Sequence, residues 1–407
     1  MTSQCVSYPT NSSDIKSCCL FWHSYTNCSV KKYETIWLQI GRIYSVVSSV
    51  FHGNESEWKV FAKNLQKVGS LQKDNGITHL SWGDDDEVDI LIGLKNKTVK
   101  TYDTDYKAFT SSVNVEYGEG QICGLSKYDR CLLTAVESGH IRVWRFKEKE
   151  GDVFNSGRPI QKMKHSKVNK NIVAFGSKNH ADLKLLDLNT KQYTFISKNV
   201  RKNELELQVP IWPSDLVFLP DGDRSVAVCT KYGQVRLYDT KGPAKRPVLS
   251  VDIPLGSLPS KSSIGREMCS LTCMSSTMKD RCVVVGSGRG QMKLIDFRGK
   301  SHIAKSYKGP VGGIRSIACS ATEPYVVSVS LDRYLRIHHL DEAKPLYQGY
   351  QKMKLNCVLV RSQMILPDIK EEEEEKQNDQ KVDSDDDIQI VAEYDSLFDD
   401  MAVLEET

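Results

Sequence analysis

The stretch Gln234-Val235-Arg236-Leu237-Tyr238-Asp239 shows the pattern that decides the fold. An apolar residue is followed by Lys or Arg, then any residue, then a large residue, and Asp often closes the copy. Six copies occur, and their first residues are 42, 42, 52, 57 and 43 positions apart: Val99, Ile141, Leu183, Val235, Met292 and Leu335. A repeat near 42 residues that is rich in short strands predicts the blades of a β-propeller.

Each copy alternates apolar and polar residues, which is the period of a half-buried strand. A tight polar turn such as Lys231-Tyr232-Gly233 precedes it, and an apolar run such as Val226-Ala227-Val228 precedes the turn. Before the apolar run lies another alternating stretch, such as Ile77 to Trp82, so the unit reads as strand, turn, strand, turn, strand. Because one such unit cannot bury its own faces, we expect the units to stack in a ring.

The repeats also predict the division of the chain. Six clear blades fall within residues 75–345, and strand-like segments at each end of the repeat array can pair to close a seventh blade. We therefore expect an all-β, seven-bladed propeller over residues 34–362. Residues 1–33 carry no blade pattern and predict a poorly ordered N-terminal extension.

Residues 363–407 predict a disordered acidic tail, because runs such as Glu371 to Glu375 cannot pack. Ser384 lies among acidic residues and is a candidate phosphorylation site, although an unmodified solvated run fits equally well. Apolar residues from Tyr394 to Leu404 recur at helical spacing, which fits either a partner-binding helix or a tail helix without function.

Charge is divided unevenly along the chain. The whole chain carries a net charge of +3. The segment from Asp368 to Thr407 holds 17 acidic residues and 3 Lys, a net charge of −14, so the remainder of the chain carries +17. A body this basic favours polyanions such as RNA. The alternative is that the basic strand residues only solvate outer edges and prevent edge pairing.

Several classes of function find no support in the sequence. No stretch of about 18 apolar residues predicts a membrane span, and no Cys or His spacing predicts a metal site. Gly286-Ser287-Gly288-Arg289-Gly290 lacks the GK[ST] ending of a phosphate loop and reads as a turn between strands. We expect no enzyme activity, cofactor or small-molecule substrate.

The residues also carry a resemblance to a known family. The runs that carry it are Glu206 to Trp212, Phe218 to Gly222, Gln234 to Asp239, Lys245 to Leu249 and Ser330 to His338. In this order they resemble the WD repeat-containing protein 74 family, over roughly residues 75–362. That family comprises nucleolar assembly factors of the large ribosomal subunit with a WD40-type propeller.

The resemblance implies a noncatalytic scaffold in the nucleus and nucleolus. Its implied partners are other assembly factors of the pre-60S particle, the ribosomal RNA precursor, and an AAA-type ATPase that releases it. It assigns a structural turn to Asp332 and suggests an assembly-facing surface at basic loop residues: Arg201, Lys202, Lys245 and Arg246.

Two features depart from the family. Residues 1–33 match nothing in it, and the chain stops at Thr407 without the basic nuclear-targeting tail of its relatives. Because WD40-type propellers also serve as adaptors between proteins, a protein-to-protein adaptor unrelated to ribosomes is the alternative function. Whether the basic loops share one face is not determined by the sequence.

Overall fold

A computed structural model describes the chain over residues 32–40, 43–50, 65–70, 76–145, 153–202, 205–255, 268–351 and 354–362. The described residues form one compact unit within residues 1–364. Their regular structure is β-strand arranged in four-stranded antiparallel sheets, so the prediction of an all-β propeller is confirmed. No helix among these residues is long and apolar enough to cross a membrane.

Six sheets are each built from four strands that follow one another in the chain. The first is β4 (Ile77–Trp82), β5 (Asp89–Leu94), β6 (Thr98–Asp103) and β7 (Ala108–Asn114). The second is β8 (Ile122–Tyr128), β9 (Cys131–Val136), β10 (His140–Trp144) and β11 (Val153–Asn155). The third is β12 (Lys162–His165), β13 (Ile172–Ser177), β14 (Ala181–Asp187) and β15 (Gln192–Ile196).

The remaining three follow the same order. The fourth is β16 (Pro213–Phe218), β17 (Ser225–Thr230), β18 (Gln234–Asp239) and β19 (Leu249–Asp252). The fifth is β20 (Leu271–Ser276), β21 (Cys282–Ser287), β22 (Met292–Asp296) and β23 (Ile303–Tyr307). The sixth is β24 (Ile314–Cys319), β25 (Tyr325–Ser330), β26 (Tyr334–His339) and β27 (Pro345–Tyr350).

Seven blades were predicted, and six are formed by four consecutive strands each. A further four-stranded sheet has the order β28-β1-β2-β3, and its strands are β28 (Leu355–Val360), β1 (Lys32–Ile40), β2 (Ile43–Val50) and β3 (Leu65–Ser70). Its β28 contacts both β24 and β4. The predicted N-terminal extension over residues 1–33 and the tail over residues 363–407 lie almost entirely outside the described residues.

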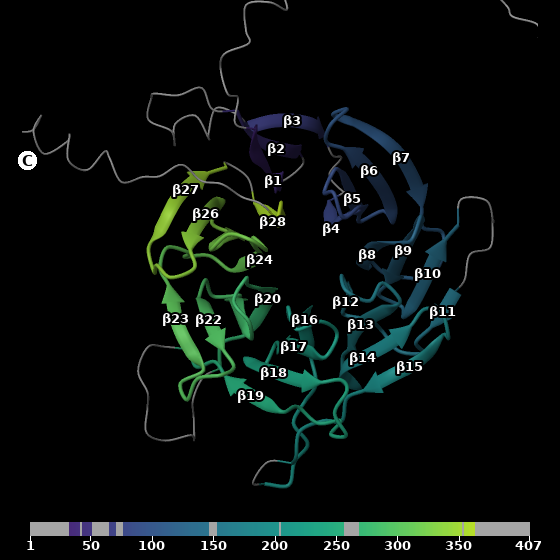
Figure 1. Cartoon of the computed structure of the whole chain (residues 1–407), viewed down its shortest axis with the longest axis vertical. Helices are drawn as coiled ribbons and strands as arrows, with labels where there is room; N and C mark the ends of the chain where they lie inside the picture. Colours follow the sequence, from purple (N-terminus) through teal and green to yellow (C-terminus); the bar gives the residue numbers. More distant parts are fainter. Residues whose placement is uncertain are drawn as a thin grey trace, which may run out of the picture. The chain divides into compact units, whose positions relative to one another are not determined.

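Figure 1 shows the first strand of each blade toward the centre of the ring and the last strand at its outside. Every copy of the repeated pattern lies in the third strand of its blade, as in β18 and β26. The turn before this strand needs a left-handed residue. In the fourth blade that residue is Gly233 (φ 81°), where an added Cβ would lie 2.8 Å from the carbonyl oxygen of Cys269.

The hydrophobic core lies between neighbouring blades. One cluster joins Leu91 and Val99 of the first blade to Ile122 and Leu125 of the second, and equivalent clusters join the later pairs. Each blade therefore buries its apolar faces against its neighbours, which is the physical reason that an isolated repeat would not be stable.

Candidate partner-binding surface

The four basic residues singled out in the sequence lie on two segments of neighbouring blades. Arg201 and Lys202 follow β15, and Lys245 and Arg246 lie between β18 and β19. The backbone N–H of Lys198 donates a hydrogen bond to the carbonyl oxygen of Lys245 at 2.7 Å, which joins the two segments. We call residues 198–202, 205–212 and 241–248 the loop pair. The structure thus brings together two segments whose proximity the sequence left open.

Short polar contacts hold each segment in place. The side-chain amide of Asn199 donates to the carbonyl oxygen of Val209 at 2.7 Å and ties the two ends of the first segment together. In the second segment, Asp239 accepts the backbone N–H groups of Lys241 and Gly242 at 3.1 Å each. A hydrogen bond from Arg224 is the main reason that the pKa of Asp239 is lowered. Asp239 therefore acts as an ionised anchor at the start of this loop.

The loop pair presents two kinds of chemistry. Its four predicted cations are exposed, and no described residue forms a salt bridge with any of them: Arg201, Lys202, Lys245 and Arg246. The same segments carry exposed aliphatic side chains, with 76% of Leu205, 60% of Leu207 and 63% of Val248 accessible to solvent. Arg binds phosphates or carboxylates in a bidentate fashion. Exposed aliphatic residues are typical of contacts with protein. The surface therefore combines groups that bind anions with groups that contact protein.

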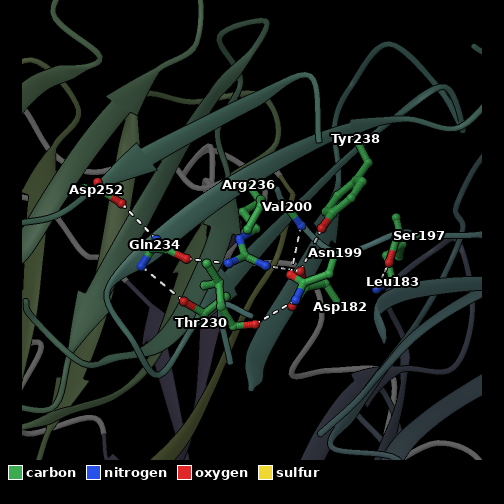
Figure 2. A network of polar contacts seen from close by, with 11 residues as sticks. Asp182, Leu183, Ser197, Asn199, Val200, Thr230, Gln234, Arg236, Tyr238 and Asp252 are labelled. Carbon is green, nitrogen blue, oxygen red and sulfur yellow. Dashed lines mark hydrogen bonds and ion pairs between the residues drawn. The ribbon is translucent and has the colours of Figure 1, made fainter. Parts of the chain in front are cut away.

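A buried polar network joins the two blades that carry these loops (Figure 2). Arg236 of β18 forms an ion pair with Asp182 of β14 in the neighbouring blade, and both side chains are at most 1% exposed. The hydroxyl of Tyr238 donates to the same carboxylate oxygen at 2.8 Å. Arg236 also donates to Gln234, whose amide nitrogen donates to Asp252 at 3.1 Å. The two blades that carry the loop pair are thus joined through their interior.

Asp332, predicted to hold a turn, has several partners in the structure. Its carboxylate accepts the backbone N–H of Tyr334 at 3.0 Å and that of Val311 at 3.3 Å, and it forms an ion pair with Arg336 at 2.7 Å. The pKa of Asp332 is lowered. Burial is the largest influence and acts to raise it, but donors led by Ser330 outweigh that influence. Ser384 lies outside the described residues.

The structure shows a role for the repeated cations that was not predicted. In four of the six copies the cation is buried: Lys184, Arg236, Lys293 and Arg336. Arg142 stacks on Trp144, with the guanidinium carbon 4.1 Å from the ring centroid. The sequence contained an indication of this burial, because Lys or Arg recurs at one position of every copy. Such regularity is typical of a structural role in each blade. The suggestion that these residues only solvate outer edges is wrong for the four buried ones.

Among the described residues, no group of three or more potential metal ligands is close enough to hold an ion. All the cysteines described are free thiols: Cys123, Cys131, Cys229, Cys269, Cys273, Cys282, Cys319 and Cys357. Burial raises the pKa of Cys273 to about 12, which removes it as a thiolate nucleophile near neutral pH.

Comparison with known proteins places the chain in a family. No protein-family model matches it. The human WD repeat-containing protein 74 is 34% identical over 306 residues, which covers 74% of this chain and 75% of the relative. The bovine protein of the same name is 34% identical over 80% of this chain and 81% of its own length. The ribosome biogenesis protein nsa1 of Schizosaccharomyces pombe is 24% identical over 76% of this chain and 84% of its own length. The chain belongs to the WD repeat-containing protein 74 family.

Proposed function

We propose that this protein is a noncatalytic ribosome biogenesis factor that binds precursors of the large subunit through the loop pair. Relatives named as ribosome biogenesis proteins support the process. The observation that carries the binding surface is the hydrogen bond between Lys198 and Lys245, since it joins two exposed basic segments of neighbouring blades. Such a surface suits the phosphates of a ribosomal RNA precursor or an acidic assembly factor.

Finer elements of the proposal follow from the family and the strand order. The pairing of β28 with β1 supports a seven-bladed ring over residues 34–362 that is closed by the two ends of the repeat array. Residues 1–33 and 363–407 would then be an extension and an acidic tail. Action in the nucleolus, binding to other pre-60S assembly factors and release by an AAA-type ATPase belong to the same proposal.

The test is affinity purification of the tagged full-length chain from nuclear extract, with sequencing of the RNA that co-purifies. We expect enrichment of large-subunit precursor RNA. The variant Lys245→Glu/Arg246→Glu should weaken this association, and the salt dependence of the remaining binding should become less steep by about 0.7 per lost phosphate contact. The matched control is Lys300→Glu/Lys344→Glu, which reverses two exposed charges elsewhere.

The outcomes separate the two candidate functions. Recovery of proteins without precursor RNA would contradict the proposal and leave a WD40 protein-to-protein adaptor. Equal recovery of RNA by the loop-pair variant and its control would show that another surface binds the particle.

A further inference from the structure

One face of the ring combines positive charge with an exposed aromatic side chain. Each of the six blades has a turn between its second and third strands, and because the blades repeat one antiparallel strand order, these turns lie on the same face. The charged residues of the six turns are six cations and two carboxylates: Lys95, Lys97, Lys178, Lys231, Arg289 and Arg333, and Glu137 and Asp332. The turns between the first and second strands, on the opposite face, carry six cations and nine carboxylates. The turns of the first face are therefore better suited to a polyanion.

The exposed aromatic side chain is Tyr232, in the turn between β17 and β18. It is 39% exposed, and its ring makes an edge contact with Trp212, with centroids 6.3 Å apart and an interplanar angle of 69°. The ammonium of Lys178 lies 3.6 Å from the centroid of the Trp212 ring. Lys178 is exposed, and no described carboxylate forms a salt bridge with it. Neighbouring blades thus bring together three side chains, which we call the aromatic platform: Lys178, Trp212 and Tyr232.

Backbone hydrogen bonds hold the platform in position. The N–H of Asn179 donates to the carbonyl oxygen of Ile211 at 2.9 Å, and the N–H of Lys231 donates to that of Trp212 at 2.9 Å. The segment before β16 is therefore fixed to the turns of both neighbouring blades. Gly233, with φ 81°, closes the second of these turns. Because the backbone is held before a ligand arrives, binding costs little ordering of the protein.

The fold leaves the polar groups of these two rings available. Among the described residues, none accepts a hydrogen bond from the hydroxyl of Tyr232 or from the indole N–H of Trp212. By contrast, the indole N–H of Trp144 in the second blade donates to the hydroxyl of Thr134 at 2.9 Å. Aromatic residues that serve packing usually satisfy their polar atom within the protein in this way. Tyr232 and Trp212 keep theirs for solvent or a ligand.

We propose that the aromatic platform binds single-stranded RNA by stacking a nucleobase on the ring of Tyr232. The inference rests on the proposed function and narrows its ligand to unpaired RNA, because the bases of a duplex are not free to stack on a side chain. Lys178 supplies positive charge for the flanking phosphates. The connection that carries Arg201 and Lys202 ends at Trp212, so a strand bound at the platform would continue onto the loop pair. An acidic protein segment would use the cations but would not need an open ring.

The test is fluorescence anisotropy of the full chain with two labelled strands of about 12 nucleotides, a length within the usual range of single-strand sites. One is unstructured RNA, and the other has the same sugars and phosphates but no bases. Tyr232→Leu should weaken binding of the RNA about 5- to 150-fold, the range expected for the loss of one base–aromatic stack, and leave binding of the abasic strand unchanged. Tyr232→Phe keeps the ring and should keep most of the binding. The matched control is Tyr106→Leu, at a tyrosine that is 83% exposed between β6 and β7, and it should bind as the wild type does.

Several results would overturn the inference. It is wrong if the wild type does not bind the RNA, or if Tyr232→Leu and Tyr106→Leu bind it equally. An equal loss for the RNA and the abasic strand would also contradict it, because only charge or folding would then have changed. The same holds if Tyr232→Phe loses as much binding as Tyr232→Leu.

The proposed function is tested separately, by the loop-pair variant in nuclear extract. If Lys245→Glu/Arg246→Glu loses precursor RNA there while Tyr232→Leu binds the RNA strand normally, the proposed function stands and the aromatic platform does not.

Discussion

The strongest quantitative prediction concerns the buried ion pair between Asp182 and Arg236. Replacing Asp182 by Ala leaves a guanidinium with no exposed surface and one neutral acceptor, Gln234. It also removes the only acceptor of the Tyr238 hydroxyl that the structure shows, at 2.8 Å. Breaking one side of a buried pair costs about 3–5 kcal/mol. We therefore expect the free energy of unfolding to fall by about 4 kcal/mol.

The assay is equilibrium urea unfolding together with thermal melting of the full chain. For a domain of this size, with about 2.1 cal/mol/K of unfolding entropy per residue, that loss lowers the thermal midpoint by about 6 °C. The matched control is Arg224→Met, which breaks the ion pair between Arg224 and Asp239. The Arg224 side chain is 61% accessible to solvent. Solvent screens an exposed pair, so the control should change stability little.

A double-mutant cycle then tests the cause. Asp182→Ala/Arg236→Met removes both charges, so no guanidinium remains buried without its partner, and we expect a cost well below the sum of the single substitutions. The reasoning would be refuted if Asp182→Ala costs no more than Arg224→Met. Strict additivity in the double variant would refute it as well, because the two side chains would then not depend on one another.

Three further predictions concern a turn, a buried imidazole and the end of β28. Arg333→Gly removes a left-handed residue with φ 74° and should raise the thermal midpoint, with a gain of about 0.5–1 kcal/mol, although it loses the contact of Arg333 with Tyr350. His79 has a lowered pKa, so the unfolded chain binds more protons below about pH 6.5 and stability falls as the solution is acidified. His79→Gln should flatten the fall in the urea midpoint between about pH 7 and 5. Glu87→Ala removes the acceptor of the Ser362 N–H at 2.7 Å and should speed hydrogen exchange in β28 relative to β18.

The fold could be predicted because its repeat is local. Alternating residues such as those of Val235 to Tyr238 predict a strand, and the turn before it contains the glycine that its left-handed backbone favours. The pairing of β28 with β1 depends instead on residues about 320 positions apart, as Trp37 and Leu359 illustrate. A pattern near one end of the chain does not specify its partner at the other. The sequence therefore suggested closure by the two ends but did not determine the register.

The site was predicted only in part, for a related reason. Basic residues at Arg201 and Lys245 could be recognised individually, but their shared location depends on two loops of different blades that are joined at Lys198. Leu205 and Leu207 were not recognised, because an aliphatic residue in a sequence gives no indication that it will be 76% or 60% exposed. Exposure of this kind follows from tertiary structure alone.

The buried repeat cations also change what the net charge of +17 means for partners. Arg236 and Arg336 are each neutralised by a carboxylate, and Lys293 donates to the carbonyl oxygen of Pro254 at 3.2 Å within the fold. A paired, buried charge contributes little to the field outside the protein. Attraction of a polyanion must therefore arise from the exposed cations, and the loop pair presents them on a defined surface. Reversing Lys245 and Arg246 should accordingly weaken association far more than the same change in net charge at Lys300 and Lys344, which net charge alone would not predict.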